Sequence, residues 1–338
     1  MPGTPARIVI TDYEFDSIEI EQAVAEAGSA ELYRAHCKTE DDVICAASEA
    51  DGLLVQYAPI TERVLAALPH LKVIGRYGVG VDNIDVRAAT ARGVAVCNVP
   101  DYGIDDVSDH AIALAVSLAR GIPALDRGIR QGQNCLPAVE PIHRISTQVF
   151  GVIGLGLIGT ATARKARSLG YTVVGCDALR PPGTTTEDGI PVLSFRELLA
   201  TSDVVSLHVP LNTHTLHLIN SEALENMKPS ATIINTCRGA VVDTTALVDA
   251  LRNGHLRAAG LDVFEEEPLP LDSPLLELNN VALTPHTAWY SQESHEELKR
   301  RTTQNVIDVC FGRRPRNILN PGVLPHRKVV QEALPSLQ

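Results

Sequence analysis

The 338-residue sequence lacks a long apolar segment. Its longest apolar runs, 111–119 and 149–159, are shorter than the roughly 18 residues that a membrane-spanning helix needs. The first residues contain one arginine followed by a strand-like run, which is not the pattern of a secretory signal. We therefore expect a cytoplasmic protein that has no membrane partner.

Basic residues are fewer than acidic residues. Lys and Arg number 29 against 41 Asp and Glu, which gives a net charge of −12. A protein with this charge repels the phosphodiester backbone of nucleic acids. The only dense basic cluster, 313–316, is explained as well by the solvated end of a helix as by a partner site. We expect no nucleic-acid partner.

Closely spaced cysteine pairs are absent as well. The seven cysteines are scattered without a Cys-x-x-Cys motif, which is typical of reduced thiols in the cytoplasm. His214 and His217 are three positions apart, but no set of cysteines or carboxylates completes a zinc-like shell around them. We therefore expect no metal site.

The residues that are present indicate two α/β domains. Hydrophobic residues make up 45% of the chain, enough for large cores, and domains usually contain roughly 100 to 200 residues. Strand-like and helix-like runs alternate, which predicts parallel sheets covered by helices on both faces. In the first part we expect strands at 7–10, 53–55, 73–74 and 94–97 with helices at 17–27 and 83–92. In the second we expect strands at 149–153, 172–176, 203–207, 231–235, 257–261 and 281–283.

Two further helical segments define the domain boundaries. Residues 105–130 should be largely helical and lead from the first domain into the second. The helix expected at 291–311 comes after a sheet that is already complete, so it should return to the first domain. We therefore expect one discontinuous domain at 1–100 and 291–325, a second domain at 101–290, and a tail at 326–338.

A glycine-rich turn is the sharpest local signal for a cofactor. Gly154, Gly156 and Gly159 follow a strand directly and open a helix whose first N–H groups, at Leu157 and Ile158, favour an anion. The next strand ends at Asp177, whose carboxylate can accept both ribose hydroxyls of NAD and repels the 2′-phosphate of NADP. The nearby Arg180 leaves NADP as the alternative.

Three side chains suited to binding and protonating an acidic substrate follow strands of the same sheet. Arg238, Glu267 and His286 each come just after a predicted strand, so they should meet at its carboxyl edge. Reduction of a 2-oxo acid needs a cation to bind the carboxylate, an imidazole to donate a proton, and a carboxylate to keep that imidazole protonated. A salt-bridged arginine and a structural histidine are the alternatives for each residue taken alone.

These motifs resemble those of the D-isomer-specific 2-hydroxyacid dehydrogenase family over about residues 5–320. The matching patterns are N-x-x-R-G at 235–239, D-V-F-x-x-E-P at 262–268 and T-P-H at 284–286. The resemblance implies that Arg238 binds substrate, that Glu267 pairs with His286, and that His286 is the general acid/base. It also implies a Rossmann NAD-binding domain inserted into a flavodoxin-like substrate domain.

The resemblance extends to further contacts. The glycine-rich loop 76–83 matches the family's substrate loop, in which Arg76 and the backbone around Val79 and Gly80 would hold the substrate carboxylate. The implied cofactor contacts are His208, Pro210, Thr236, Cys237 and Asp262.

Trp289, the only tryptophan in the chain, stands in the run H-T-A-W-Y-S, which resembles the C-terminal-binding-protein branch of the family. There it would line the substrate pocket; packing against the last helix is its alternative role.

We predict an NAD-dependent, D-specific 2-hydroxyacid dehydrogenase, with an NAD-sensing corepressor as the alternative. A formate dehydrogenase would instead carry glutamine at the position of Glu267. The helical segment 105–130 would form the face of a homodimer, or else belong to the core.

Overall fold

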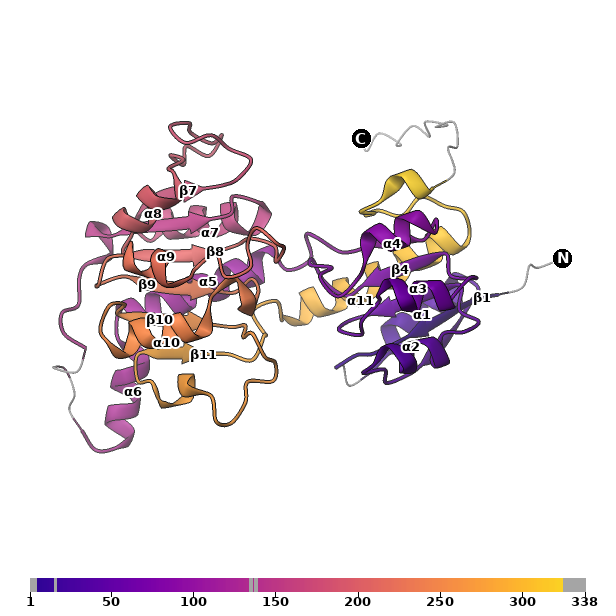
Figure 1. The fold of residues 1–338 in the computed structure, drawn as a ribbon, viewed down its shortest axis with the longest axis horizontal. Coiled ribbons are helices and arrows are strands. Elements are labelled where there is room, and N and C mark those ends of the chain that lie inside the picture. The colour runs from indigo at the N-terminus through magenta and orange to yellow at the C-terminus, as the bar shows by residue number, and fades with distance from the viewer. Residues whose placement is uncertain (1–4, 15–16, 134–135, 137–138, 325–338) are drawn as a thin grey trace, which may run out of the picture. The chain divides into compact units, whose positions relative to one another are not determined.

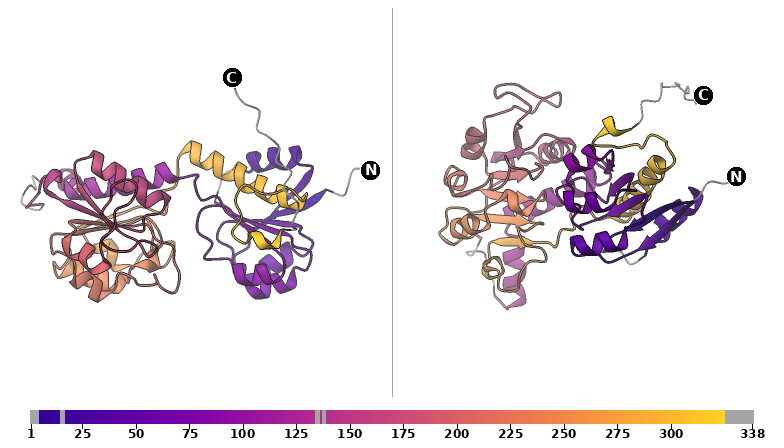
Figure 2. Two further views of the ribbon diagram at one scale, coloured as in Figure 1. Left: turned by 90° about the horizontal axis from the view of Figure 1, so that it is seen from above. Right: turned by 45° about the vertical axis from the view of Figure 1, so that its right-hand side comes forward.

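The computed structural model of the chain describes residues 5–14, 17–133, 136 and 139–324. Contacts between residues divide the chain into two compact units (Figures 1 and 2). The first contains Met1–Tyr102 and His295–Gln338, and the second contains Gly103–Ser294. The expected tail at 326–338 and Cys135 lie outside the described residues.

The first unit contains a five-stranded parallel sheet. Its strands are β1 (Ala6–Ile10), β2 (Ala30–Arg34), β3 (Gly52–Val55), β4 (Val73–Arg76) and β5 (Ala95–Cys97), in the order β2-β1-β3-β4-β5. This is the flavodoxin-like order. The sequence did not reveal β2, because this edge strand is largely solvent-accessible and its residues lack an apolar pattern.

Five helices cover this sheet. They are α1 (Glu19–Ala27), α2 (Glu40–Ala46), α3 (Glu62–Ala67), α4 (Val86–Ala91) and α11 (Gln292–Cys310). The side chains of Thr39, Thr61 and Asp85 begin α2, α3 and α4 by accepting a backbone N–H of the first turn. Most of α11 belongs to this unit, and it packs directly on the sheet: a Cβ atom added at Gly75 would lie 2.6 Å from Val306.

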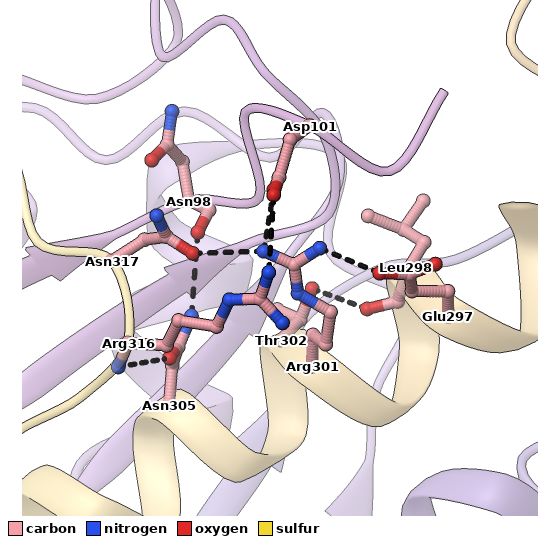
Figure 3. A network of polar contacts seen from close by, with 9 residues as sticks. All are labelled: Asn98, Asp101, Glu297, Leu298, Arg301, Thr302, Asn305, Arg316 and Asn317. Atoms are coloured by element: carbon pink, nitrogen blue, oxygen red, sulfur yellow. Dashed lines mark hydrogen bonds and ion pairs between the residues drawn. The ribbon is translucent and has the colours of Figure 1, made fainter. Parts of the chain in front are cut away.

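A polar network fixes the segment that leaves β5 to helix α11 (Figure 3). Arg301, whose side chain is only 5% exposed, donates to Asp101, Glu297 and Asn317. Arg316 also pairs with Asp101, at 3.2 Å. Burial alone would raise the pKa of Asp101, but the two arginines outweigh it and hold the pKa below its usual value. The end of the first stretch of this unit is therefore held to α11 by charge-assisted bonds.

The second unit contains a six-stranded parallel sheet. Its strands are β6 (Val149–Ile153), β7 (Thr172–Cys176), β8 (Val204–Leu207), β9 (Thr232–Asn235), β10 (Ala258–Leu261) and β11 (Val281–Leu283), in the order β11-β10-β9-β8-β6-β7. A single parallel bridge between Gly175 and Val192 adds one more position beside β7. All six predicted strands are present, and the predicted fold class of two doubly wound parallel sheets is confirmed.

Helices cover both faces of this second sheet as well (Figure 2). They are α5 (Ile104–Ala119), α6 (Ile122–Arg130), α7 (Leu157–Ser168), α8 (Phe195–Thr201), α9 (Ser221–Glu225) and α10 (Thr244–Arg252). The predicted helical segment 105–130 is interrupted between α5 and α6, because Gly121 adopts a left-handed conformation with φ 66°. Among the described residues, no helix is long and apolar enough to cross a membrane.

Candidate active site

The three predicted catalytic residues come from neighbouring strands of the second sheet. Arg238 follows β9, Glu267 lies in the loop after β10, and His286 follows β11. These strands are adjacent in the order β11-β10-β9 and run parallel. Their carboxyl ends therefore lie along one edge of the sheet, which is where open α/β sheets bind ligands.

Glu267 and His286 form a hydrogen-bonded pair. Nδ1 of His286 lies 2.7 Å from Oε2 of Glu267, and Oε1 of Glu267 accepts the backbone N–H of Phe264 at 2.9 Å. Burial would raise the pKa of Glu267, but the bond to His286, its charge and that of Arg238 lower it overall. Glu267 is therefore an ionised carboxylate that is hydrogen-bonded to Nδ1 of His286. A proton exchanged with a substrate would then be carried on Nε2, the other ring nitrogen.

A close backbone contact brings the Arg238 loop to the Glu267 loop. A Cβ atom at Gly239 would lie 1.8 Å from the carbonyl carbon of Phe264, so only glycine permits this approach. Asn235 fixes the turn between β9 and Arg238: its Nδ2 donates to the Arg238 carbonyl at 2.9 Å. These two residues explain why the N-x-x-R-G pattern presents an arginine beside the carboxylate.

Asp262 holds the loop that carries His286. Its Oδ1 accepts the Thr284 hydroxyl at 2.6 Å and the N–H of Thr287 at 2.9 Å, while its Oδ2 accepts the N–H of Ala288 at 2.9 Å. The N–H of His286 bonds to the Asp262 carbonyl at 2.6 Å. His286 has φ 54°, an uncommon conformation for a residue with a side chain. This dense set of bonds can maintain such a conformation.

A histidine that the sequence did not reveal joins this network. Nε2 of His110, on helix α5, lies 2.9 Å from the Thr284 hydroxyl and 3.7 Å from Oδ1 of Asp262. The side chain of Asp262 is 1% exposed, and each of its oxygens accepts a hydrogen bond from the loop that carries His286. Its predicted contact with the cofactor stays a prediction. No sequence motif connects His110 to residues so distant in the chain.

Trp289 lies directly against the His286 loop. Its Nε1 donates to the His286 carbonyl at 3.0 Å, and its own carbonyl accepts the Ser294 hydroxyl at 2.6 Å. The indole stacks edge-on with Tyr290, with ring centroids 5.6 Å apart. The side chain is half-buried. The orientation of the indole is thus tied to the loop that carries His286.

The glycine-rich turn after β6 fits a dinucleotide. Gly154 has φ 93°, and a Cβ atom at Gly159 would lie 1.8 Å from the Gly154 carbonyl oxygen, so the turn itself requires both glycines. A Cβ atom at Gly156 would meet no protein atom within 4 Å. The protein itself does not require the second glycine, whereas a pyrophosphate that approached this backbone closely would require it. Leu157 and Ile158 form the first turn of the following helix.

Asp177 lies beside this turn, at the end of β7. Its Oδ2 accepts the N–H of Leu155 at 2.7 Å, and its Oδ1 accepts the N–H of Leu179 at 2.8 Å. A carboxylate oxygen has a second lone pair, so Asp177 can also accept ribose hydroxyls. The backbone of Arg180 bonds back to the Asp177 carbonyl at 3.1 Å, which places this arginine in the same turn.

The other predicted cofactor contacts follow β8 and β9. The hydroxyl of Thr236 is buried without a hydrogen-bond partner, as a group awaiting a ligand would be. The Cys237 thiol lies 3.1 Å from Oδ1 of Asn235. Nε2 of His208 lies 2.8 Å from the Ser206 hydroxyl. Removal of the imidazole from water lowers the pKa of His208 to about 4, so this side chain is neutral. Pro210 is exposed two positions further.

The predicted substrate loop belongs to the first unit and follows β4. Arg76 folds back so that its Nη1 would lie 1.6 Å from a Cβ atom at Gly78, whose φ is 132°. The carbonyl of Val79 accepts Nδ2 of Asn98 at 2.7 Å. Val79 is 39% exposed and Gly80 is partly exposed. The loop therefore combines a buried arginine with accessible backbone, and consecutive backbone N–H groups suit a carboxylate.

A buried ion pair supports this loop. The hydroxyl of Tyr77 donates to Oε1 of Glu21 at 3.1 Å, and Nζ of Lys299 lies 3.2 Å from Oε2 of Glu21. The side chains of Glu21 and Lys299 are 0% and 3% exposed. Helices α1 and α11 thus meet at a buried charge pair that Tyr77, the second residue of the loop, contacts.

His217 has a partner of its own. Its Nε2 lies 2.5 Å from Oε1 of Glu265, whose Oε2 accepts the N–H of Thr244 at 2.9 Å. Burial opposes ionisation of Glu265, but its bonds to Thr244 and His217 lower the pKa overall. Among the described residues, no group of three or more His, Cys, Asp or Glu could hold a metal ion.

Comparison with known proteins agrees with this geometry. Residues 112–288, slightly more than half of the chain, match the family model described as "D-isomer specific 2-hydroxyacid dehydrogenase, NAD binding domain". A glyoxylate reductase of Korarchaeum cryptofilum is 40% identical over 80% of this chain and 82% of its own length. A D-3-phosphoglycerate dehydrogenase of Mycobacterium bovis is 42% identical over 83% of this chain, which spans only 53% of that relative.

A solved structure extends the likeness to nearly the whole chain. The D-lactate dehydrogenase of Aquifex aeolicus, in complex with NAD and lactic acid, superimposes with a TM-score of 0.82 at 29% identity. The match covers 93% of this chain and 99% of that one. Fold and site together define an NAD-dependent oxidoreductase that acts on 2-hydroxy and 2-oxo acids. The chain belongs to the D-isomer-specific 2-hydroxyacid dehydrogenase family.

Proposed function

We propose that this enzyme reduces a 2-oxo acid to the D-2-hydroxy acid, with His286 as general acid, Glu267 as its partner and Arg238 as the substrate-binding cation. The observation that carries the proposal is the 2.7 Å pair of His286 and Glu267 on the edge shared with Arg238. NADH, when bound, supplies the hydride that is transferred to C2 of the substrate. In the reverse direction the same residues serve oxidation.

His286 and Glu267 control the proton. In reduction, Nε2 of His286 donates its proton to the carbonyl oxygen as the C–O double bond becomes a C–O single bond. Nδ1 stays bound to Glu267, whose carboxylate stabilises the protonated imidazole before transfer and orients the ring throughout. Oxidation requires the neutral imidazole, which accepts the hydroxyl proton at the same nitrogen.

Arg238 and the loop at Arg76, Val79 and Gly80 bind the substrate. A guanidinium can hold the C1 carboxylate and also stabilise the negative charge that develops on the carbonyl oxygen. Backbone N–H groups of the loop are suited to a carboxylate as well. On this basis the first unit is the substrate-binding domain and the second unit the NAD-binding domain.

For the cofactor, we propose that Asp177 selects NADH over NADPH. Its carboxylate would lie close to the 2′-phosphate and repel it. Gly154, Gly156 and Gly159, with the N–H groups at Leu157 and Ile158, would hold the pyrophosphate. His208, Pro210, Thr236, Cys237 and Asp262 are the proposed contacts toward the nicotinamide end, and the unpartnered hydroxyl of Thr236 supports this.

Trp289 is the proposed determinant of the substrate side chain. Its bond to the His286 carbonyl supports a position beside the reacting carbon. A tryptophan wall favours an apolar side chain of medium size over glyoxylate. It is also the residue on which the proposed likeness to the C-terminal-binding-protein branch rests. A corepressor role is not favoured, because the reported relatives are named as enzymes.

We also propose that the enzyme is a cytoplasmic homodimer. Helix α6 supports a dimer face, because Ile122 is 52% exposed and Ile129 is 69% exposed there. The described cysteines are all free thiols, as expected in a reducing compartment.

One experiment tests the proposed reaction. The purified protein is incubated with NADH and a panel of 2-oxo acids from glyoxylate to branched-chain members. Loss of NADH absorbance is followed, and the product is resolved on a chiral column. We expect D-2-hydroxy acids, formed fastest from apolar substrates of medium size. Formation of the L-isomer, or the absence of turnover with every 2-oxo acid, would contradict the proposal.

A further inference from the structure

The carboxyl edge of the first sheet holds a negative side chain at the point where such sheets usually bind a ligand. In the order β2-β1-β3-β4-β5, the direction of winding changes between β1 and β3. Ligands of open parallel sheets bind outside the strand ends at this switch point. Asp12 follows β1 and Gln56 follows β3, so both residues lie at this switch point.

Asp12 fills an anion-binding nest of backbone N–H groups. Its Oδ1 accepts the N–H of Gln56 at 3.1 Å, and its Oδ2 accepts the N–H groups of Tyr57 and, at 3.1 Å, Ala58. The Thr11 hydroxyl donates to Oδ1 at 2.7 Å. Consecutive N–H groups of this kind usually capture a phosphate or carboxylate of a ligand. Here the chain supplies the anion itself.

This nest adjoins the proposed substrate loop. Nδ2 of Asn83, at the end of the loop, donates to the Ala58 carbonyl at 3.0 Å, and the N–H of Ile60 donates to the Asn83 carbonyl at 2.9 Å. Burial raises the pKa of Tyr77 well above its usual value, and the charges of Glu21 and Asp12 raise it further. The field of Asp12 therefore reaches the loop that would bind the substrate.

The charges around the loop suit a single anionic group. Arg76 can balance one carboxylate. Among the described residues that follow β1, β3 and β4, at 11–14, 56–61 and 77–83, there is no lysine or arginine, whereas Asp12, Glu14 and Asp82 are acidic. Arg34 ends β2 on the far side of β1, where it contacts the Tyr13 hydroxyl at 3.4 Å. In these three described loops, a second anionic group of a substrate would meet Asp12 and no lysine or arginine.

We propose that Asp12, bound in the nest at Gln56–Ala58, restricts the enzyme to 2-oxo acids whose only anionic group is the C1 carboxylate. Substrates with an uncharged side chain are accepted, and those with a second carboxylate or a phosphate are rejected. This inference rests on the proposed 2-oxo acid reduction. It separates this chain from the reaction named for its D-3-phosphoglycerate dehydrogenase relatives.

Two matched pairs of substrates test the inference. Hydroxypyruvate is compared with 3-phosphohydroxypyruvate, and the 4-methyl ester of oxaloacetate with oxaloacetate, by measuring kcat/KM with NADH. We expect the neutral member of each pair to be favoured at least roughly tenfold, since like charges placed together strongly disfavour a ligand. The preference should decrease as ionic strength rises, because salt screens the charge of a partly exposed Asp12.

A charge-gain variant locates the discrimination. Tyr57 is 42% exposed beside the nest, so Tyr57→Arg adds a cation there, and Tyr57→Gln is the matched control for loss of the ring. We expect Tyr57→Arg to raise the kcat/KM ratio of 3-phosphohydroxypyruvate to hydroxypyruvate at least roughly fivefold over Tyr57→Gln, by pairing the phosphate. Asp12→Asn, if folded by circular dichroism, should shift the ratio in the same direction.

The outcomes are distinct. Equal kcat/KM for both members of each pair in the unmodified enzyme would overturn the inference and leave the proposed reaction intact. A preference that Tyr57→Arg and Tyr57→Gln alter equally would overturn the role of this edge. If no 2-oxo acid is reduced, the proposed function fails, and the inference fails with it.

Discussion

Replacement of Glu267 by glutamine should move the pH profile of reduction toward acid. The His286 hydrogen bond and charge, assisted by Arg238, lower the pKa of Glu267 against the opposing effect of burial. Glu267 therefore places a negative charge 2.7 Å from Nδ1 of His286. Glutamine keeps the side-chain shape and a hydrogen-bond acceptor but loses the charge.

The structure indicates the magnitude. Nδ1 and Oε2 are 2.7 Å apart, and an opposite charge within about 4–6 Å is worth roughly 1–3 pH units in such a titration. The basic limb of kcat/KM for reduction should therefore move at least about one unit toward acid, because the reaction needs protonated His286. Oxidation needs the neutral form, so its acidic limb should move in the same direction and oxidation should persist to lower pH.

The assay is a pair of pH profiles, one in each direction, measured under kcat/KM conditions. Glu265→Gln is the matched control, since Glu265 lies two positions away and pairs with His217 instead. We expect its profile to coincide with that of the unmodified enzyme. If Glu267→Gln leaves both limbs in place, or if Glu265→Gln moves them equally, Glu267 is not the partner of the acid/base.

Three further predictions concern the cofactor, the pocket and the fold. Asp177→Ala should reduce the preference for NADH over NADPH, measured as a ratio of kcat/KM; equal use of both cofactors by the unmodified enzyme would refute this role. Trp289→Ala should raise KM for bulky 2-oxo acids far more than KM for NADH, whereas unchanged substrate preference with less folded protein would indicate a packing role. Lys299→Met should lower the free energy of unfolding in urea by about 3 kcal/mol, because it leaves Glu21 buried without its cation. Burial raises the pKa of Glu21, so the folded state binds its proton more tightly and the loss should grow as pH rises; a loss independent of pH would contradict this account.

Much of the second unit could be predicted because its signals are local. Buried strands such as β8 and β9 are continuous apolar runs, and the residues that follow them must reach one edge of a parallel sheet. The arrangement of Arg238, Glu267 and His286 along that edge follows from these two facts. Their catalytic roles, like those of the cofactor contacts, stay predictions.

Other features depend on contacts between distant residues and leave no local pattern. Strand β2 was not recognised, because only one of its sides pairs with the sheet and its side chains are largely accessible. His110 and Thr284 are hydrogen-bonded although 174 positions separate them in the sequence. The nest around Asp12 joins two loops that follow different strands, so no spacing in the sequence indicates it. Such tertiary hydrogen bonds require the folded chain.

The most direct test of the account is the turnover of His286→Ala. Reduction of the best 2-oxo acid by NADH is measured at saturation, and NADH affinity is measured separately by quenching of protein fluorescence. We expect kcat to fall at least roughly 100-fold, the lower range for loss of a general acid, while the Kd for NADH stays within about twofold. Near-normal turnover by this variant would contradict the central claim that His286 exchanges the proton with the substrate.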